Sequence, residues 1–68
     1  MVTIYGKDAC PYTGDAREHY GRLGETQYIN VKKDAAALQR MLELTGGQRR
    51  VPVIVTGDGK VTIGFGGT

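Results

Sequence analysis

Short apolar segments and longer amphipathic segments alternate along the chain. Residues 2–5 and 27–31 are rich in β-branched and aromatic side chains, and each predicts a strand. Residues 51–55 are apolar and extended, and the turn at 57–59, Gly-Asp-Gly, leads into a returning strand at 60–63. The pattern therefore predicts four strands, of which the last two form a hairpin.

Two helices are predicted between these strands. The first begins at Cys10-Pro11, because proline is favoured at the first helical position, and Gly24 is its stop signal. Asp34 is a good N-cap for the second helix, over residues 35–44, and Gly46-Gly47 ends it. The positions at helical spacing are Ala35, Leu38, Met41, Leu42 and Thr45.

The element order is β-α-β-α-β-β, and the 68 residues make one domain, residues 1–68. A β-α-β unit requires a right-handed crossover and parallel strands, whereas the final hairpin is antiparallel. The expected fold class is therefore α/β, a mixed four-stranded sheet with helices on its faces. A chain this short holds no large cavity, so its chemistry is expected on an edge, a loop or a helix end.

Composition excludes several classes of function. Nine basic and seven acidic residues give a net charge of +2, and no basic stripe alternates with aromatic residues, so we expect no nucleic-acid partner. The single cysteine cannot form an internal disulfide or a four-ligand zinc site, and we expect no metal. No apolar run approaches a membrane span, and we expect a cytoplasmic protein without a membrane partner.

Cys10 is the residue with the clearest potential for chemistry. A cysteine at a helix N-terminus has a lowered pKa, because free backbone N–H groups and the helix dipole favour the thiolate. Lys7, three residues earlier, adds a positive charge nearby. The alternative is an inert packing residue, since cysteine is also a small apolar side chain. The pattern of residues alone leaves both interpretations open.

A family resemblance favours the reactive thiol. The segment from Lys7 to Thr13, Lys-Asp-Ala-Cys-Pro-Tyr-Thr, resembles the glutaredoxin active site, whose hallmark is Cys-Pro-Tyr-Cys after the first strand. Val51-Pro52 resembles the Val-Pro motif of the family, and Gly64-Phe65-Gly66-Gly67 resembles its glycine-containing turn. The resemblance covers essentially the whole chain and implies a thioredoxin-like fold. The most similar group is the small bacterial one in which the cysteine is sometimes selenocysteine.

The resemblance implies a glutathione-dependent thiol-disulfide oxidoreductase. Cys10 would be the nucleophile, which attacks a disulfide sulfur and forms a mixed disulfide. Pro11 would shape the turn and tune the thiol, and Tyr12 would contact glutathione. Lys7 would favour the thiolate and meet a carboxylate of glutathione. The implied partners are glutathione, as co-substrate, and proteins that carry disulfides or glutathione adducts.

Further glutathione contacts are implied in the second half of the chain. Val51 would offer its backbone N–H and C=O to the cysteinyl part of glutathione, as an added strand does. Pro52 would be cis and would shape the groove. Arg49 or Arg50 would pair with the glycyl carboxylate. The γ-glutamyl end would lie at Gly66, Gly67 and Thr68.

Three departures from the family pattern change these expectations. Thr13 replaces the second cysteine, which leaves a monothiol route in which Thr13 hydrogen-bonds the thiolate. Arg50 stands where the family usually has threonine. The sequence ends at Thr68 without the usual C-terminal helix, so we expect an uncovered apolar sheet face and either a homodimer or a chain that continues.

Two other functions stay open. Monothiol glutaredoxins can hold an iron-sulfur cluster between two subunits, although that subgroup resembles Cys-Gly-Phe-Ser and not the Cys-Pro-Tyr seen here. A glutaredoxin-fold interaction module without catalysis would also explain the missing second cysteine. The only histidine, His19, lies nine residues after Cys10, too far along the helix for a Cys-His pair, and we interpret it as structural or solvated.

Overall fold

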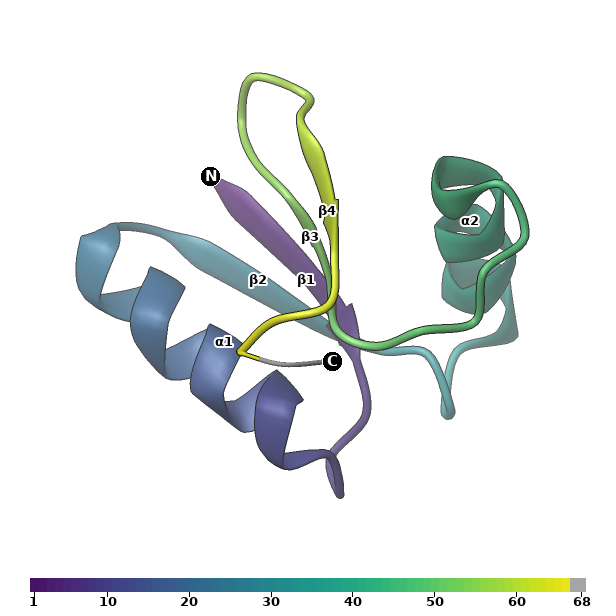
Figure 1. Cartoon of the computed structure of the whole chain (residues 1–68), viewed down its shortest axis with the longest axis horizontal. Coiled ribbons are helices and arrows are strands. Elements are labelled where there is room, and N and C mark those ends of the chain that lie inside the picture. Colours follow the sequence, from purple (N-terminus) through teal and green to yellow (C-terminus); the bar gives the residue numbers. More distant parts are fainter. Residues whose placement is uncertain (67–68) are drawn as a thin grey trace.

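A computed structural model describes residues 1–66 of the chain. The elements follow the predicted order (Figure 1). They are β1 (Val2–Gly6), α1 (Pro11–Leu23), β2 (Thr26–Asn30), α2 (Ala35–Thr45), β3 (Val53–Val55) and β4 (Val61–Ile63).

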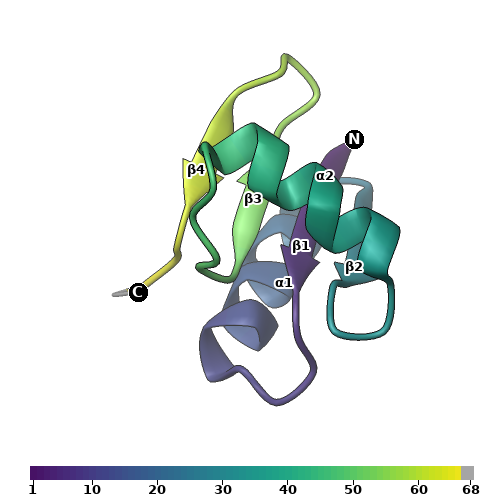
Figure 2. The same ribbon diagram turned by 90° about the vertical axis from the view of Figure 1, so that its right-hand side faces the viewer.

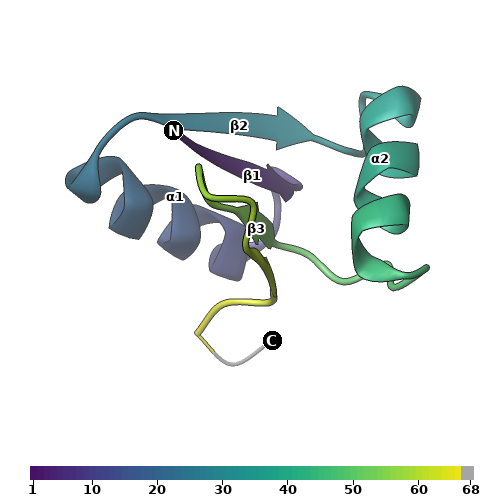
Figure 3. The same cartoon turned by 90° about the horizontal axis from the view of Figure 1, so that it is seen from above.

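The strands form one four-stranded sheet in the order β2-β1-β3-β4. β1 pairs with β2 in parallel, while β1–β3 and β3–β4 are antiparallel. The two helices lie on opposite faces of this sheet, as the views in Figures 2 and 3 show. The structure therefore confirms the mixed sheet and the α/β fold class.

Neighbouring residues of the central strand β1 supply the two halves of the core. Ile4 lies on the α1 side, where it packs with Ala16 and Ile54. Tyr5 lies on the α2 side. Successive side chains of a strand point to opposite faces, so a central strand covered on both sides buries apolar residues at consecutive positions. The buried residues that pack with Tyr5 are Val31, Ala37, Met41 and Val53.

Local signals place the helix ends as expected. Cys10 is the N-cap of α1 and Pro11 its first residue. The Asp34 carboxylate accepts a hydrogen bond of 3.0 Å from the backbone N–H of Ala37 at the start of α2. α2 ends at Thr45, and its C-cap is Gly46, whose φ of 71° is in the left-handed region that glycine tolerates. Of the positions at helical spacing on α2, Met41 and Thr45 are buried and Ala35 is exposed, while Ala37 is also buried.

The third strand is shorter than the apolar run predicts. The ladder with β1 begins at Val53, because Pro52 has no N–H to donate to a neighbouring strand. The Val51-Pro52 peptide bond is cis, as the family resemblance implies. The Pro52 carbonyl still accepts a hydrogen bond of 2.7 Å from the backbone N–H of Gly64, which ties the chain after β4 to this proline.

The segment after β4 covers part of the α1 face of the sheet. Phe65 packs against the cluster around Ile4 and Ile54, both of which are 0% exposed. Its ring centroid is 6.0 Å from that of Tyr20 and 5.4 Å from that of His19. Phe65 therefore covers part of the face that was expected to be uncovered, and the Ile4 and Ile54 side chains beneath it are buried. A homodimer stays an untested prediction.

Candidate active site around Cys10

Cys10 lies between the carboxyl end of β1 and the first turn of α1, and it is partly exposed. Its backbone N–H donates to the Lys7 carbonyl at 3.3 Å, and its own carbonyl accepts from the Gly14 N–H at 3.2 Å. The backbone is extended at Cys10, with φ −93° and ψ 116°. This cap geometry directs the free N–H groups of the first helical turn toward the cysteine.

The surroundings of Cys10 favour the thiolate. Burial by itself raises the pKa of the Cys10 thiol, but hydrogen bonds from the Thr13 side chain and from the backbone N–H groups of Thr13 and Tyr12 outweigh it. The positive charge of Lys7 acts in the same direction as these hydrogen bonds. The pKa of Cys10 consequently lies below its ordinary value of 9.0. The fraction of thiolate at neutral pH is larger than for a free cysteine.

Thr13 occupies an unusual position for a polar residue. Its side chain is 1% exposed, and the hydroxyl oxygen has no partner at ordinary hydrogen-bond geometry among the described residues. The hydroxyl lies close enough to Cys10 to lower the thiol pKa. A buried hydroxyl without a partner costs free energy, because it loses its water contacts. Ionisation of Cys10 supplies an acceptor for this hydroxyl.

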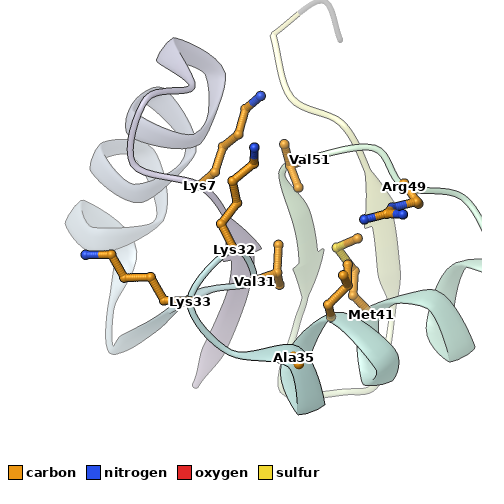
Figure 4. Close-up of a pocket in the computed structure, with 9 residues that line it drawn as sticks. Lys7, Val31, Lys32, Lys33, Ala35, Met41, Arg49 and Val51 are labelled. Atoms are coloured by element: carbon orange, nitrogen blue, oxygen red, sulfur yellow. The ribbon is translucent and has the colours of Figure 1, made fainter.

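A cationic pocket of about 540 Å³ lies beside this loop. Lys7 forms one wall with Val51, and Arg49 faces them across the pocket (Figure 4). Lys7 and Lys32 extend side by side, while Lys33 points away. The other lining residues are Val31, Ala35, Leu38 and Met41. The lining combines an apolar floor with cationic groups and contains no carboxylate, which suits an anionic ligand with some apolar surface.

The structure brings most of the predicted site residues to the same end of the sheet. Tyr12 is 39% exposed at the start of α1, and Pro11 is exposed next to it. Gly66 lies against the Tyr12 ring, since a Cβ on Gly66 would be 3.6 Å from Tyr12 Cδ1. Arg50 is exposed but is not part of the pocket lining, which contains Arg49. Gly67 lies outside the described residues.

Sequence reasoning missed a polar cluster next to the Cys10 loop. The Tyr28 hydroxyl donates to Asp8 at 2.8 Å, and Lys33 Nζ lies 3.8 Å from the other Asp8 carboxylate oxygen. Arg17 lies over the Tyr28 ring at 4.1 Å from its centroid. Twenty residues separate Asp8 from Tyr28, so no local motif indicates this contact. His19 contacts aromatic rings, which agrees with its structural interpretation.

Residues 1–66 contain no cluster of three or more histidine, cysteine or acidic side chains that could hold a metal ion. Within the same range, neither helix has the length and apolar character needed to cross a membrane.

The fold and the site define a class of protein: a small α/β domain with a cysteine at the start of its first helix, where the thiolate is stabilised. A model of the glutaredoxin family matches residues 2–61, and the chain belongs to this family. Among solved structures, a crystal structure of the glutaredoxin (grx-1) from Archaeoglobus fulgidus is 27% identical with a TM-score of 0.81. The match covers 96% of this chain and 75% of the archaeal one. The comparison with curated proteins found no match.

Membership in this family has two general consequences. Glutaredoxins are typically thiol-disulfide oxidoreductases, and the family implies the use of glutathione. Their usual partners are glutathione and proteins with disulfides.

Proposed function

We propose that this chain is a glutathione-dependent oxidoreductase that acts by a monothiol mechanism through Cys10. The observation that carries the proposal is the stabilised thiolate at Cys10 combined with the buried Thr13 in the place of a second cysteine. The thiolate is the attacking species in thiol-disulfide exchange. With Cys10 the sole cysteine, no intramolecular disulfide can follow the first step.

The reaction runs in two exchanges that balance in atoms and electrons. In the first, the Cys10 thiolate attacks the glutathione sulfur of a protein-glutathione disulfide, the old S–S bond breaks, and the protein leaves as a thiolate that takes up a proton. In the second, the thiolate of free glutathione attacks the glutathione sulfur bound to Cys10. Oxidised glutathione leaves, and the Cys10 thiolate is restored. The protein–glutathione disulfide is reduced to the protein thiol, and one free glutathione is oxidised as it joins the transferred glutathione in oxidised glutathione.

The groups around Cys10 supply what these exchanges need. The N–H groups of Tyr12 and Thr13, the Thr13 hydroxyl and Lys7 stabilise the thiolate both before attack and when it leaves. A leaving thiolate of low pKa departs faster. Pro11 begins the helix and keeps Cys10 at its N-cap.

The cationic pocket supports a glutathione site next to the thiol. Lys7 and Arg49 would pair with the glycyl carboxylate, and the Val51 backbone would pair with the cysteinyl amide groups. Pro52, the next residue, is buried and would help to hold that backbone in place. Tyr12 and Gly66 would border the groove on the side of the γ-glutamyl group, where Gly67 follows in the sequence.

The test is deglutathionylation of a glutathionylated peptide, followed by intact mass and by the release of oxidised glutathione. We expect turnover by the wild type and a mixed disulfide of one glutathione on Cys10. Cys10→Ser should abolish both signals, while Thr13→Ser should retain them. A wild type that binds glutathione but neither forms the adduct nor turns over would contradict the proposal and favour an interaction module.

A further inference from the structure

Tyr28 connects two segments that flank Cys10 in the sequence. Its hydroxyl donates to Asp8, two residues before Cys10, at 2.8 Å. The guanidinium of Arg17, seven residues after Cys10, lies 4.1 Å from the centroid of the same ring. One side chain of the edge strand β2 thus contacts both the loop that leads to the cysteine and the helix that follows it.

Strand register places Tyr28 there. In the parallel β1–β2 pair, Tyr28 is the partner of Ile4, whose side chain lies on the α1 face of the sheet. Paired residues of neighbouring strands point to the same face. The ring of Tyr28 therefore lies under α1, and its hydroxyl reaches the loop at the carboxyl end of β1.

Both oxygens of the Asp8 carboxylate are engaged by this arrangement. Oδ1 accepts from Tyr28, and Oδ2 lies 3.8 Å from Lys33 Nζ. Burial and the contact with Asp8 raise the pKa of Tyr28 to about 12, so the hydroxyl keeps its proton at neutral pH. The Tyr28 hydroxyl can therefore donate this hydrogen bond to Asp8 throughout the neutral pH range.

We propose that Tyr28 is a positioning residue for Cys10, which acts by holding the Asp8 carboxylate on the β2 side of the loop and away from the Cys10 sulfur. This inference rests on the proposed role of Cys10 as nucleophile. Its physical basis is charge repulsion, because an unengaged carboxylate two residues from a thiolate opposes ionisation of the thiol. Lys7 is the cation that favours the thiolate, and a released Asp8 would offset it.

The charged groups around the loop determine whether a released Asp8 would favour or oppose ionisation of Cys10. Lys7, Lys32, Lys33 and Arg49 line the pocket, and Lys33 also lies beside Asp8, while Arg17 lies over the Tyr28 ring. Asp8 is thus the acidic side chain closest in sequence to Cys10, and its position is set by Tyr28 and Lys33. Removing the Tyr28 hydroxyl leaves only the contact between Asp8 and Lys33.

The experiment measures the rate of Cys10 alkylation by iodoacetamide as a function of pH. Tyr28→Phe keeps the ring under Arg17 but removes the hydrogen bond to Asp8. We expect alkylation at neutral pH to slow by roughly two- to fivefold, the size of an exposed charge interaction, with an unchanged limiting rate at high pH. Tyr20→Phe is the matched control, because it removes a tyrosine hydroxyl on α1 away from Asp8, and it should leave the profile unchanged.

A double-mutant cycle separates positioning from general loosening of the fold. In an Asp8→Asn background, Tyr28→Phe should have no further effect on the alkylation profile, because no carboxylate remains to be released. An equal slowing in both backgrounds, or no slowing with Tyr28→Phe alone, would overturn the proposal. Iodoacetamide requires no glutathione, so this result stands apart from the deglutathionylation test of the proposed function.

Discussion

The Cα of Gly6 lies directly against the side chain of Thr13. A Cβ built on Gly6 would stand 2.5 Å from Thr13 Cγ2 and 2.7 Å from its Oγ1. Gly6 ends β1 and Thr13 lies in the first turn of α1, and both are buried. Thr13 can approach Cys10 from the core side because the strand end beneath it has no side chain.

This contact predicts that Gly6→Ala destabilises the protein. The added methyl group would force Thr13 or the strand end to move, and overpacking of this kind costs about 1–3 kcal/mol. Gly21→Ala is the control, because a Cβ on Gly21, in the last turn of α1, meets nothing within 4 Å and should stabilise by at most about 1 kcal/mol. Denaturant unfolding of both variants checks the prediction. Equal stability of the two variants would show that the structure accommodates a methyl group between Gly6 and Thr13 without cost.

Replacing Thr13 with valine should separate stability from reactivity. Thr13→Val keeps the shape of the side chain and removes a buried hydroxyl without an ordinary partner, so the free energy of unfolding should stay the same or rise. The thiolate of Cys10 loses one hydrogen bond, and alkylation at neutral pH should slow by roughly three- to tenfold. Thr13→Ser retains the hydroxyl and should react like the wild type. If Thr13→Ser slowed the alkylation of Cys10 as much as Thr13→Val does, the effect would come from packing and not from the hydroxyl.

The lowered pKa of Cys10 predicts a pH dependence of stability. A group that ionises more readily when folded contributes stability above its unfolded pKa, and this contribution is lost as the pH falls through the folded pKa. The free energy of unfolding should therefore rise with pH in the window that ends near the ordinary value of 9.0. Cys10→Ser should remove this rise while leaving the slopes from other groups. Parallel curves for the two proteins across that window would contradict the lowered pKa.

The two neighbouring arginines before Val51 should differ in their effect on glutathione. Arg49 lines the pocket with Lys7, whereas Arg50 is exposed outside the lining. Arg49→Gln should raise the KM for glutathione roughly five- to tenfold, the loss of one charge-assisted contact, with little change in kcat. Arg50→Gln serves as the control with the same change of charge. A larger effect at Arg50 would place the carboxylate on the other side of the loop.

Local rules explain why much of the fold and the core of the candidate site can be predicted. Pro11 at the first helical position, the Asp34 N-cap and the glycine at 46 act within one turn of chain, and the helices begin and end there. Cys10 becomes an N-cap for the same reason, so its placement follows from its neighbours in the sequence.

The less regular features could not be predicted in this way. The third strand begins two residues later than its apolar run, because Pro52 cannot donate to the ladder. Phe65 covers part of the α1 face from the glycine-rich segment after β4, which by its sequence resembles only a glycine-containing turn. Such contacts depend on how distant segments pack, which local propensity does not contain.

The sequence by itself determined the order of elements, the two-sided core strands and the cysteine at a helix start, because each depends on residues within a few positions of one another. The tertiary structure decided which of Arg49 and Arg50 lines the pocket and that Thr13 is buried against Gly6. It also decided that Tyr28 reaches Asp8 across twenty residues. These relations depend on strand register and on the packing of α1 on the sheet, which exist only once the chain has folded.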